Sequence, residues 1–392
     1  MIRRLSSILV CTLTFALALT CAPRPARAVD PYEINAIVGL TGGYAFVGNG
    51  LRQGLLGYEE TVNKAGGING RPIKFVFSDD QSNPQVAVQL VNGLIAKKVP
   101  LILGPTGVAN CNAVAPLVKD GPTLYCLSPG FAPQAGSYIY SVSVGPADLQ
   151  VAEMRYIRER GFKRIALLAS TDGAGQEFER SEDLALARPE NKDIVVVARE
   201  HFAPNDVTVT AQMSRIKAAG PQFFMMLCTG TPMGTVLRSA QDVGLDVPFM
   251  IPNSNATYPQ MKQYAAFLPK EMYFPNQTLT APEGVTDKGV RDALNLYITK
   301  MTAMGLKPDI QGMGWDAGLI VVAALKKTGL NANADQVRDA IAGLQNLAGA
   351  TGRYDFKAIP QRGIGVDGVI TQRWDADKSE WIAVGKPGGG VK

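Results

Sequence analysis

Histidine is almost absent from this chain of 392 residues, which holds only His201. General acid–base catalysis, serine–histidine nucleophiles and most zinc sites use histidine, so its scarcity argues against a hydrolase or a zinc enzyme. His201 follows the apolar run 194–198 at its polar end, where we expect a solvated side chain. The P-loop, H-E-x-x-H and G-x-S-x-G motifs are also missing. We therefore predict a protein that is not an enzyme, with no catalytic residue, no metal site and no cofactor.

Clusters of positive charge are also absent once the first 28 residues are set aside. Those residues begin with Arg3 and Arg4, continue into an apolar run and end on Ala26-Arg27-Ala28, which is typical of a cleaved secretory signal peptide. They carry four arginines and no acid, so the formal net charge of +5 becomes +1 for residues 29–392. This near-neutral remainder lacks the basic surface that nucleic acids and anionic membranes attract, and we expect neither as a partner.

Long hydrophobic runs are missing after the leader. No later stretch approaches the roughly 18 uncharged apolar residues that a membrane-spanning helix needs, so we expect a monomer free in the periplasm. Cys21, inside the leader, raises the alternative of a lipid anchor. Ala18-Leu19-Thr20 lacks the small residue expected directly before a lipidated cysteine, and Ala26-Arg27-Ala28 offers the better cleavage site.

Three cysteines remain after the leader: Cys111, Cys126 and Cys228. An exported protein meets an oxidising compartment, where two of them can form a disulfide. Cys111 lies early in a predicted helix, and Cys126 lies late in the strand that follows and runs back along it. Helix and strand both advance about 12 Å between the two cysteines, so we predict a Cys111–Cys126 disulfide, with two buried free thiols as the alternative. We expect Cys228 to be a buried free thiol.

Short β-rich runs alternate with amphipathic helical stretches from residue 33 onward. Asn83-Pro84 is a typical helix start, with an N-cap side chain followed by proline. This alternation predicts an α/β fold of two doubly wound parallel-sheet lobes, joined by a hinge that the chain crosses several times. The predicted division is a signal peptide (1–28), lobe 1 (29–146 and 277–367), lobe 2 (147–276 and 368–385) and a flexible tail (386–392).

The glycines of Gly48-Asn-Gly50-Leu-Arg-Gln-Gly54 follow a predicted strand, as in a dinucleotide-binding turn. Their spacing differs from G-x-G-x-x-G, and the loop 41–47 separates them from the strand, whereas the nucleotide fingerprint needs its glycines in the turn itself. We expect these glycines to allow close packing of a helix and a loop instead.

Polar and aromatic loops follow six of the predicted strands at their carboxyl ends. Open α/β sheets bind ligands at this edge, and the helices after Thr106 and Gly175 would direct N–H groups toward an anion there. Two lobes that close on a small solute would bring the loops to one cleft. The loops are Thr41–Phe46, Gly104–Gly107, Ser128–Phe131, Ser170–Gly175, Thr229–Thr231 and Pro252–Asn255.

Several short sequence motifs, together with the leader and the order of elements, indicate a known family. They are Ile37-Val-Gly-Leu-Thr-Gly42, Asn63-Lys-Ala-Gly-Gly-Ile-Asn-Gly70-Arg-Pro, Asp79-Asp80, Ile102-Leu-Gly-Pro105, Leu127-Ser-Pro129 and Gly314-Trp-Asp-Ala317. The chain resembles the type I periplasmic solute-binding proteins of ABC importers, in the branched-chain amino acid and amide group, over nearly its whole length after the leader. The resemblance implies a small-molecule ligand and the membrane permease subunits of an ABC importer as partners.

The resemblance also implies where a ligand lies. In leucine-binding relatives, two loops of lobe 1 hold the ligand carboxylate, and lobe 2 holds its ammonium with a glutamate and tyrosines. An α-amino acid fits poorly here, because neutral or small residues stand at the ammonium positions and an unpaired buried ammonium costs several kcal/mol. Asp172 is a substitute partner that keeps an amino acid open. The carboxylate positions correspond to Thr106, Gly107, Val108, Ser128, Gly130 and Phe131, and the ammonium positions to Ala174, Thr229 and Asn253.

Aromatic residues of lobe 1 indicate a larger, flatter ligand. Tyr44, Phe46 and Phe131 supply aromatic surface, and Ala174 replaces a bulky group. Ordinary packing of the cleft is the alternative explanation for these aromatic residues.

We therefore predict the solute-binding component of an ABC transporter, which captures a small carboxylate-bearing organic solute, favouring an aromatic or oxo acid, and delivers it to a permease. The alternatives are a protein that binds branched-chain amino acids or amides, a ligand-binding sensor module and an exported enzyme, and the scarcity of histidine argues against the enzyme.

Overall fold

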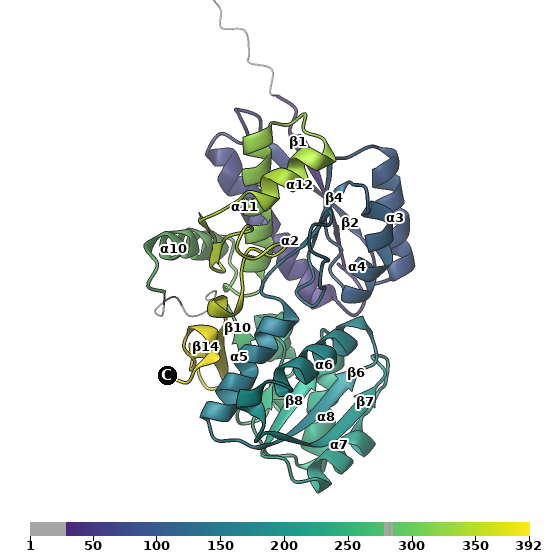
Figure 1. Ribbon diagram of the computed structural model, residues 1–392, viewed down its shortest axis with the longest axis vertical. Helices are drawn as coiled ribbons and strands as arrows, with labels where there is room; N and C mark the ends of the chain where they lie inside the picture. The colour runs from purple at the N-terminus through teal and green to yellow at the C-terminus, as the bar shows by residue number, and fades with distance from the viewer. Residues whose placement is uncertain (1–28, 278–281, 283–284) are drawn as a thin grey trace, which may run out of the picture.

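A computed structural model describes residues 29–277, 282 and 285–392. The predicted signal peptide and Cys21 lie outside the described residues. The described chain forms two lobes, each built around one β-sheet, with the later helices packed against the first lobe (Figure 1). The strands of each sheet fall within the ranges predicted for that lobe, and we keep those boundaries as a working division.

Lobe 1 contains a five-stranded sheet in the order β2-β1-β3-β4-β5, in which every pair of neighbours is parallel. Three later helices pack into the core of this lobe. The elements are β1 (Tyr32–Val38), α2 (Ala45–Lys64), β2 (Ile73–Asp79), α3 (Pro84–Ala96), β3 (Leu101–Leu103), α4 (Val108–Val114), η1 (Ala115–Val118), β4 (Thr123–Cys126), β5 (Ile139–Ser141), α10 (Lys288–Ala303), α11 (Gln311–Thr328), α12 (Ala334–Ala342), β11 (Leu347–Ala348) and β12 (Arg353–Tyr354).

Lobe 2 contains a seven-stranded sheet in the order β14-β13-β10-β9-β8-β6-β7. Its first five strands in sequence are parallel, and the antiparallel hairpin β13–β14 from the end of the chain adds to β10. The elements are α5 (Pro146–Glu159), β6 (Arg164–Ser170), α6 (Gly173–Leu186), η2 (Pro189–Asn191), β7 (Val195–Phe202), α7 (Thr210–Ala218), β8 (Phe223–Leu227), α8 (Pro232–Val243), β9 (Phe249–Met250), η3 (Asn253–Asn255), α9 (Tyr258–Gln263), η4 (Ala265–Phe267), β10 (Met272–Asn276), η7 (Val366–Gly368), β13 (Ile370–Asp375), β14 (Glu380–Ala383) and η8 (Pro387–Gly389).

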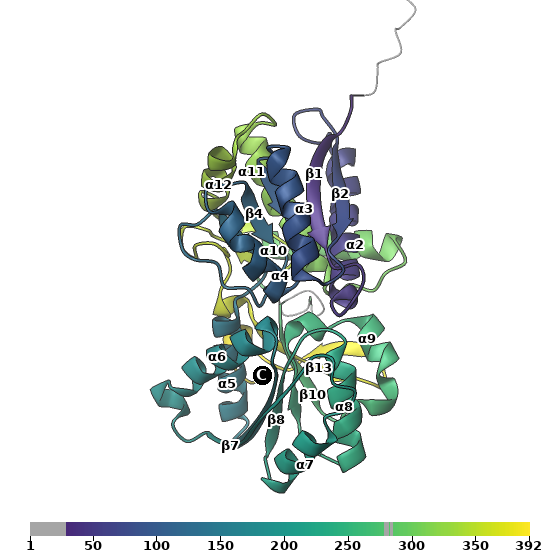
Figure 2. The ribbon, with the colours of Figure 1, turned by 90° about the vertical axis from the view of Figure 1, so that its right-hand side faces the viewer.

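Both sheets reverse their winding direction next to their first strand in sequence. β1 lies between β2 and β3, and β6 lies between β7 and β8, so each lobe has a topological switch point. Loops at the carboxyl ends of strands that flank such a point form the usual ligand crevice of an open α/β sheet. Figure 2 shows the two lobes meeting at the end of each sheet where these loops lie.

Local sequence signals account for several helix ends. The Asn83 side chain accepts hydrogen bonds from the N–H groups of Gln85 and Val86, which confirms the predicted start of α3. Helix α2 begins at Ala45, so the predicted loop Thr41–Phe46 ends inside its first turn. The earlier start places Phe46 on a helix rather than on a flexible loop.

The glycines of α2 serve packing, as expected. A Cβ atom at Gly54 would overlap the carbonyl oxygen of Gln311, and one at Gly314 would overlap that of Leu51, so α2 and α11 approach backbone to backbone. A Cβ at Gly48 would overlap the carbonyl of Gly39 after β1. These contacts explain why glycine recurs here without a nucleotide-binding turn.

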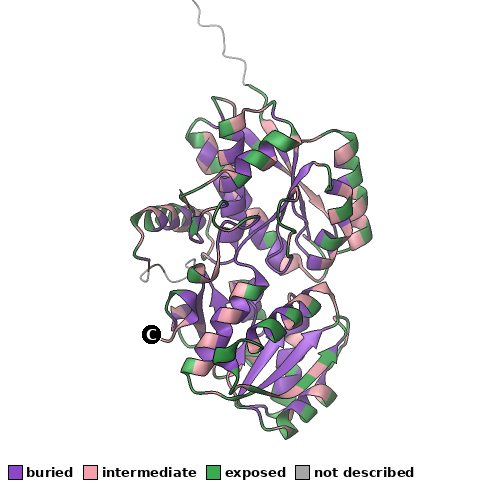
Figure 3. Ribbon diagram, in the orientation of Figure 1, coloured by how far each residue is buried: buried purple, intermediate pink, exposed green. Residues whose placement is uncertain are grey.

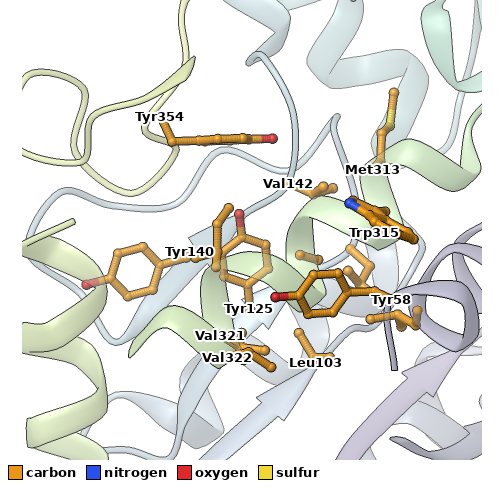
Figure 4. Packing of buried hydrophobic residues seen from close by; sticks show 14 of the residues in the cluster. Tyr58, Leu103, Tyr125, Tyr140, Val142, Met313, Trp315, Val321, Val322 and Tyr354 are labelled. Atoms are coloured by element: carbon orange, nitrogen blue, oxygen red, sulfur yellow. The ribbon is translucent and has the colours of Figure 1, made fainter. Parts of the chain in front are cut away.

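Hydrophobic cores fill both lobes, and the central strands are buried (Figure 3). Aromatic rings dominate the lobe 1 core shown in Figure 4, where Tyr125 stacks on Tyr140 at 6.3 Å between centroids and Tyr58 meets Trp315 edge-on at 5.3 Å. Because Trp315 lies on α11, this late helix is part of the core of lobe 1.

The predicted disulfide is present. Cys111 and Cys126 are bonded, their Cα atoms lie 6.4 Å apart, and both side chains are buried in the lobe 1 core. Cys228 is a buried free cysteine, as expected, and burial raises the pKa of its thiol. The bridge joins α4 to β4. Helix α4 begins with the predicted site residue Val108, and β4 leads into the predicted ligand loop Ser128–Phe131.

The end of the chain contradicts the predicted flexible tail. Gly388 accepts a hydrogen bond from the Arg155 guanidinium at 2.9 Å, and the Val391 N–H donates to Glu159 at 2.8 Å. Gly389 sits so close to the Ala152 carbonyl of α5 that a Cβ atom would overlap it. The glycine run that suggested fraying is instead what lets this segment lie on α5.

Candidate functional site

The two lobes touch at the carboxyl ends of β1 and β8. The N–H of Thr231 in lobe 2 donates to the carbonyl of Gly43 in lobe 1 at 3.2 Å. Gly230, with φ at +86°, approaches the same carbonyl so closely that a Cβ atom would overlap it. The lobes are therefore closed onto each other at this edge, and glycine permits the contact.

Tyr44 is the side chain that bridges the cleft. Its hydroxyl donates to Asp172 of lobe 2 at 3.4 Å, and its ring lies against Gly107, where a Cβ atom would come within 2.6 Å of the ring. Burial, followed by the nearby Asp172 carboxylate, raises the pKa of the Tyr44 hydroxyl, which therefore stays protonated and acts as a donor. The predicted residues Tyr44, Gly107 and Asp172 thus meet in one place.

Asp172 already has hydrogen-bond donors within the protein. As the N-cap of α6 it accepts from the Gly175 N–H at 3.0 Å and from the Ser170 hydroxyl at 2.7 Å, both through Oδ1. Its Oδ2 accepts from Tyr44. This carboxylate caps α6 and joins the two lobes, so three hydrogen bonds already engage it before a ligand arrives.

The predicted residues of lobe 1 form a buried wall. Thr106 accepts a hydrogen bond from the Gly39 N–H at 3.2 Å, and Ser128 has its carbonyl bound by the Ser141 hydroxyl at 2.7 Å. A Cβ atom at Gly130 would come within 2.8 Å of Val108. The structure therefore brings the two predicted carboxylate loops into contact with each other.

Across the cleft, Val108 shares a hydrophobic cluster with Ala174 and Phe178 of lobe 2. Helix α4, which begins at Val108, has only seven residues and continues as the 3₁₀ turn η1. The backbone that faces the cleft here is thus a short turn of helix, held in place by apolar contact with α6.

Thr229 and Asn253 follow neighbouring strands of lobe 2. The Thr229 hydroxyl shares a 3.0 Å hydrogen bond with the hydroxyl of Ser254. Asn253 is 1% exposed, and neither its amide nitrogen nor its amide oxygen has a hydrogen-bond partner among the residues that the structure describes. A buried amide without partners costs about 1–3 kcal/mol per polar atom, which a bound solute could recover.

Two predicted aromatic residues lie away from this cluster. Phe131 packs with Ile37 and Cys111 in the hydrophobic core of lobe 1. Phe46 meets Tyr264 edge-on at 6.5 Å and lines a separate cavity of about 290 Å³ between α2 and Thr257. Of the three predicted aromatic residues, Tyr44 alone contacts the cluster.

Arg362 is a buried residue next to the site that the sequence did not indicate. Its guanidinium donates to the carbonyl oxygens of Pro129 and Phe131 in the predicted ligand loop. It also donates to those of Val142 and Ser143, in the crossing segment that leads from β5 of lobe 1 to α5 of lobe 2. No local pattern distinguishes this arginine, because a distant loop carries it to the site.

His201 lies outside the site. It is on β7, its side chain is 48% exposed, and its Nε2 is 2.9 Å from Glu179. Over residues 29–277, 282 and 285–392, no group of three or more histidine, cysteine or acidic side chains is placed to hold a metal ion. In the same part of the chain, no helix has the length and apolar character needed to cross a membrane.

Comparisons with known proteins place this geometry in a family. The profile of the periplasmic binding protein family matches residues 31–379. A leucine-, isoleucine-, valine-, threonine- and alanine-binding protein of Pseudomonas aeruginosa is 28% identical over 60% of this chain and 64% of the relative. The chain thus matches less than two thirds of the length of such curated relatives.

Solved structures agree on the fold. A branched-chain amino acid transporter substrate-binding protein from Streptococcus pneumoniae, in complex with isoleucine, superposes with a TM-score of 0.73 at 18% identity, covering 93% of this chain and 98% of that one. An ABC transporter solute-binding protein from Rhodopseudomonas palustris, in complex with benzoate, gives 0.72 at 18% identity, covering 91% and 96%. The chain therefore belongs to the periplasmic binding protein family, and its fold is that of the type I members.

Proposed function

We propose that the protein is the periplasmic solute-binding component of an ABC importer and that it captures a small organic acid without a charged amine, favouring an aromatic or oxo acid. The binding of this acid occurs between the lobes, at the cluster around Tyr44, Gly107, Gly130 and Asp172. Closure of the lobes is the only mechanical step, and no covalent chemistry is involved. Export through a cleaved signal peptide and a monomeric state belong to the same proposal.

The hydrogen bonding of Asp172 is the main observation that favours an acid as the ligand. A ligand ammonium needs a carboxylate partner, because its desolvation otherwise costs several kcal/mol. Among the predicted site residues, Asp172 is the one carboxylate, and its oxygens already accept from Gly175, Ser170 and Tyr44. A ligand without an ammonium leaves this network intact.

Asn253 supports the same choice. It stands where the resemblance implies a glutamate, and a neutral amide cannot offset an ammonium charge. Its unpartnered nitrogen can donate to a carboxylate or keto oxygen. A solute with oxygen acceptors therefore satisfies a buried group that the protein leaves open.

Binding of a branched-chain amino acid is the second candidate. It is supported by the Pseudomonas relative, whose name specifies leucine, isoleucine, valine, threonine and alanine, and by the isoleucine complex of the Streptococcus structure. The benzoate complex of the Rhodopseudomonas structure supports the acid instead. For an amino acid to bind, Asp172 would have to accept the ligand ammonium beside or in place of the Tyr44 hydroxyl.

Isothermal titration calorimetry separates these candidates. The protein is titrated with benzoate, phenylpyruvate, benzamide and leucine, and we expect heat from an acid and none from leucine. The matched variant is Asn253→Glu, which restores the carboxylate and should weaken the acid while it strengthens leucine. Tight leucine binding by the wild type with no response to either acid would overturn the choice of ligand.

Delivery to a permease is tested in the cells that produce the protein. Deletion of the gene should remove high-affinity uptake of the labelled acid, and re-expression should restore it. Unchanged uptake together with a lost transcriptional or motility response would identify a sensor instead. Formation of a chemically altered product during incubation with the acid would identify an enzyme.

A further inference from the structure

Arg362 is a buried cation whose hydrogen bonds, within the described residues, all go to backbone carbonyl groups. The residue is 8% exposed. One of its terminal nitrogens donates to Val142 at 3.2 Å and to Ser143 at 3.1 Å, and the other donates to Pro129 at 3.1 Å and to Phe131. Within the described part of the chain, no carboxylate lies at ion-pair distance from it.

The charge of this guanidinium is only partly balanced. Burial lowers the pKa of Arg362 to about 10, which leaves it protonated at neutral pH. Asp148 and Glu177 are the acidic groups that act on it from a distance. Burial in turn raises the pKa of the Asp148 carboxyl. A cation held in a dry interior without an ion-pair partner projects a field over several ångströms, because little water is present to screen it.

The contacts of Arg362 also fix the orientation of the ligand loop. In a planar trans peptide the N–H points opposite to the C=O. The carbonyls of Pro129 and Phe131 face Arg362, so the N–H groups of the same peptide units, on Gly130 and Ala132, face away from it. The Ser141 hydroxyl holds the start of the same loop by donating to the Ser128 carbonyl at 2.7 Å.

Gly130 lies on the cleft side of the loop. A Cβ atom there would come within 2.8 Å of Val108 and 3.9 Å of Phe178 from lobe 2. The peptide unit that Arg362 binds through the Pro129 carbonyl directs its N–H away from Arg362, in a loop that lies beside Val108 and Phe178. Hydrogen bonding of the carbonyl to a cation polarises that N–H and makes it a stronger donor to an anion.

Arg362 also connects the Ser128–Ala132 loop to the segment that crosses from lobe 1 to lobe 2. Ser143 has an unusual positive φ of 68°, and its hydroxyl donates to Gln277, another crossing residue, at 3.1 Å. Next to Arg362, the Gln361 carbonyl accepts from the Ser141 N–H at 3.0 Å. Residues 361–362 thus bind both the ligand loop and the crossing segment and fix their positions relative to each other.

We propose that Arg362 is the positioning residue that makes the cleft selective for negatively charged solutes, by orienting and polarising the peptide units of the Ser128–Ala132 loop from behind. This inference rests on the proposed function in one respect: the solute is taken to carry a carboxylate. Both an aromatic acid and an amino acid meet that condition, so Arg362 can be tested with either.

The experiment compares an acid with its neutral amide on three proteins. Binding of benzoate and benzamide is measured by calorimetry for the wild type, Arg362→Gln and Arg362→Lys. Because charge-assisted hydrogen bonds contribute about 1.5–3 kcal/mol, Arg362→Gln should weaken the acid about 10- to 100-fold more than the amide. Arg362→Lys keeps the charge, so it should retain the preference for the acid even where both ligands bind more weakly.

Arg164→Gln is the matched control. Arg164 also donates to backbone carbonyls, those of Ala219 and Gly220, but it lies on the far side of lobe 2. This variant should leave the ratio of acid to amide affinity unchanged. Equal weakening of acid and amide by Arg362→Gln, or an unchanged affinity for the acid, would overturn the proposal.

Two further outcomes remain decisive. If the wild type binds leucine and no aromatic acid, the proposed ligand class is wrong, and the same comparison is made with leucine and leucinamide. If Arg362→Gln does not fold, the Arg362→Lys variant carries the test, and loss of its preference for the acid would contradict the proposal.

Discussion

The pH dependence of stability should be set in large part by Glu182, a carboxyl group buried between α5 and α6. It has no exposed surface, and its Oε1 has no hydrogen-bond partner in the described part of the chain. The Gln150 amide, oriented to satisfy its neighbours, donates to Glu182 Oε2 at 2.6 Å and to Glu153 Oε2 at 2.7 Å. Burial, with a smaller contribution from Asp183 and against the effect of Arg199, raises the pKa of Glu182 to about 8. Burial and then Glu182 raise the pKa of Glu153 in the same direction.

The sign and size of the effect follow from proton linkage. An unfolded glutamate titrates near 4.3, so between about pH 4.3 and 8 the folded protein holds a proton that the unfolded chain has lost. The free energy of unfolding therefore falls as pH rises, by up to about 1.4 kcal/mol per pH unit. Between pH 5 and 7.5, Glu182 alone should lower it by about 3 kcal/mol.

Urea unfolding at a series of pH values measures this loss. Glu182→Gln is always neutral, so the variant should match the wild type near pH 5 and exceed its unfolding free energy by about 3 kcal/mol at pH 7.5. Glu190→Gln, a change of an exposed glutamate on η2, is the control and should track the wild type at every pH. Parallel curves for the wild type and Glu182→Gln from pH 5 to 7.5 would refute the reasoning.

Three further changes have defined outcomes. Replacement of Cys111 and Cys126 by alanine opens a loop of 15 residues and should lower the unfolding free energy by about 3 kcal/mol in urea titrations, whereas equal midpoints would contradict a structural role. Gly230→Ala places a Cβ atom against the Gly43 carbonyl of the closed form, so calorimetry should show ligand binding weakened at least about 10-fold, and wild-type affinity would show that closure does not need this contact. Asp316 is a buried carboxylate that accepts hydrogen bonds from two backbone N–H groups and two hydroxyl groups. Asp316→Asn should lower the free energy of unfolding by about 2–4 kcal/mol and with it the melting temperature. An unchanged melting temperature would contradict this.

Much of the architecture could be predicted because it depends on local patterns. The alternation of β-rich and helical stretches specified two parallel sheets, and Asn83-Pro84 specified the start of α3. The Cys111–Cys126 bridge also followed from local geometry, since the rise per residue of a helix and of the next strand places the two cysteines at the same height.

Predictions failed where a distant segment decides the environment. Phe131 is apolar, and its loop could turn the ring toward either the cleft or the core; the lobe 1 core receives it. The glycine-rich end 386–392 has the composition of a frayed tail, yet it packs on α5, where Gly389 approaches the Ala152 carbonyl too closely for a Cβ atom. Composition alone contains no information about such a partner.

The sequence by itself determined the fold class, the pairing of its cysteines and the loops that meet at the cleft, because these depend on periodicity and spacing along the chain. Tertiary structure decided which charges are buried and what they contact. Arg362, Glu182 and Asp172 are ordinary charged residues in sequence. Their roles arise from the ligand loop, from helix α5 and from Tyr44, none of which is their neighbour along the chain. Electrostatic selectivity depends on that burial, since the same charges in water would be screened to little effect.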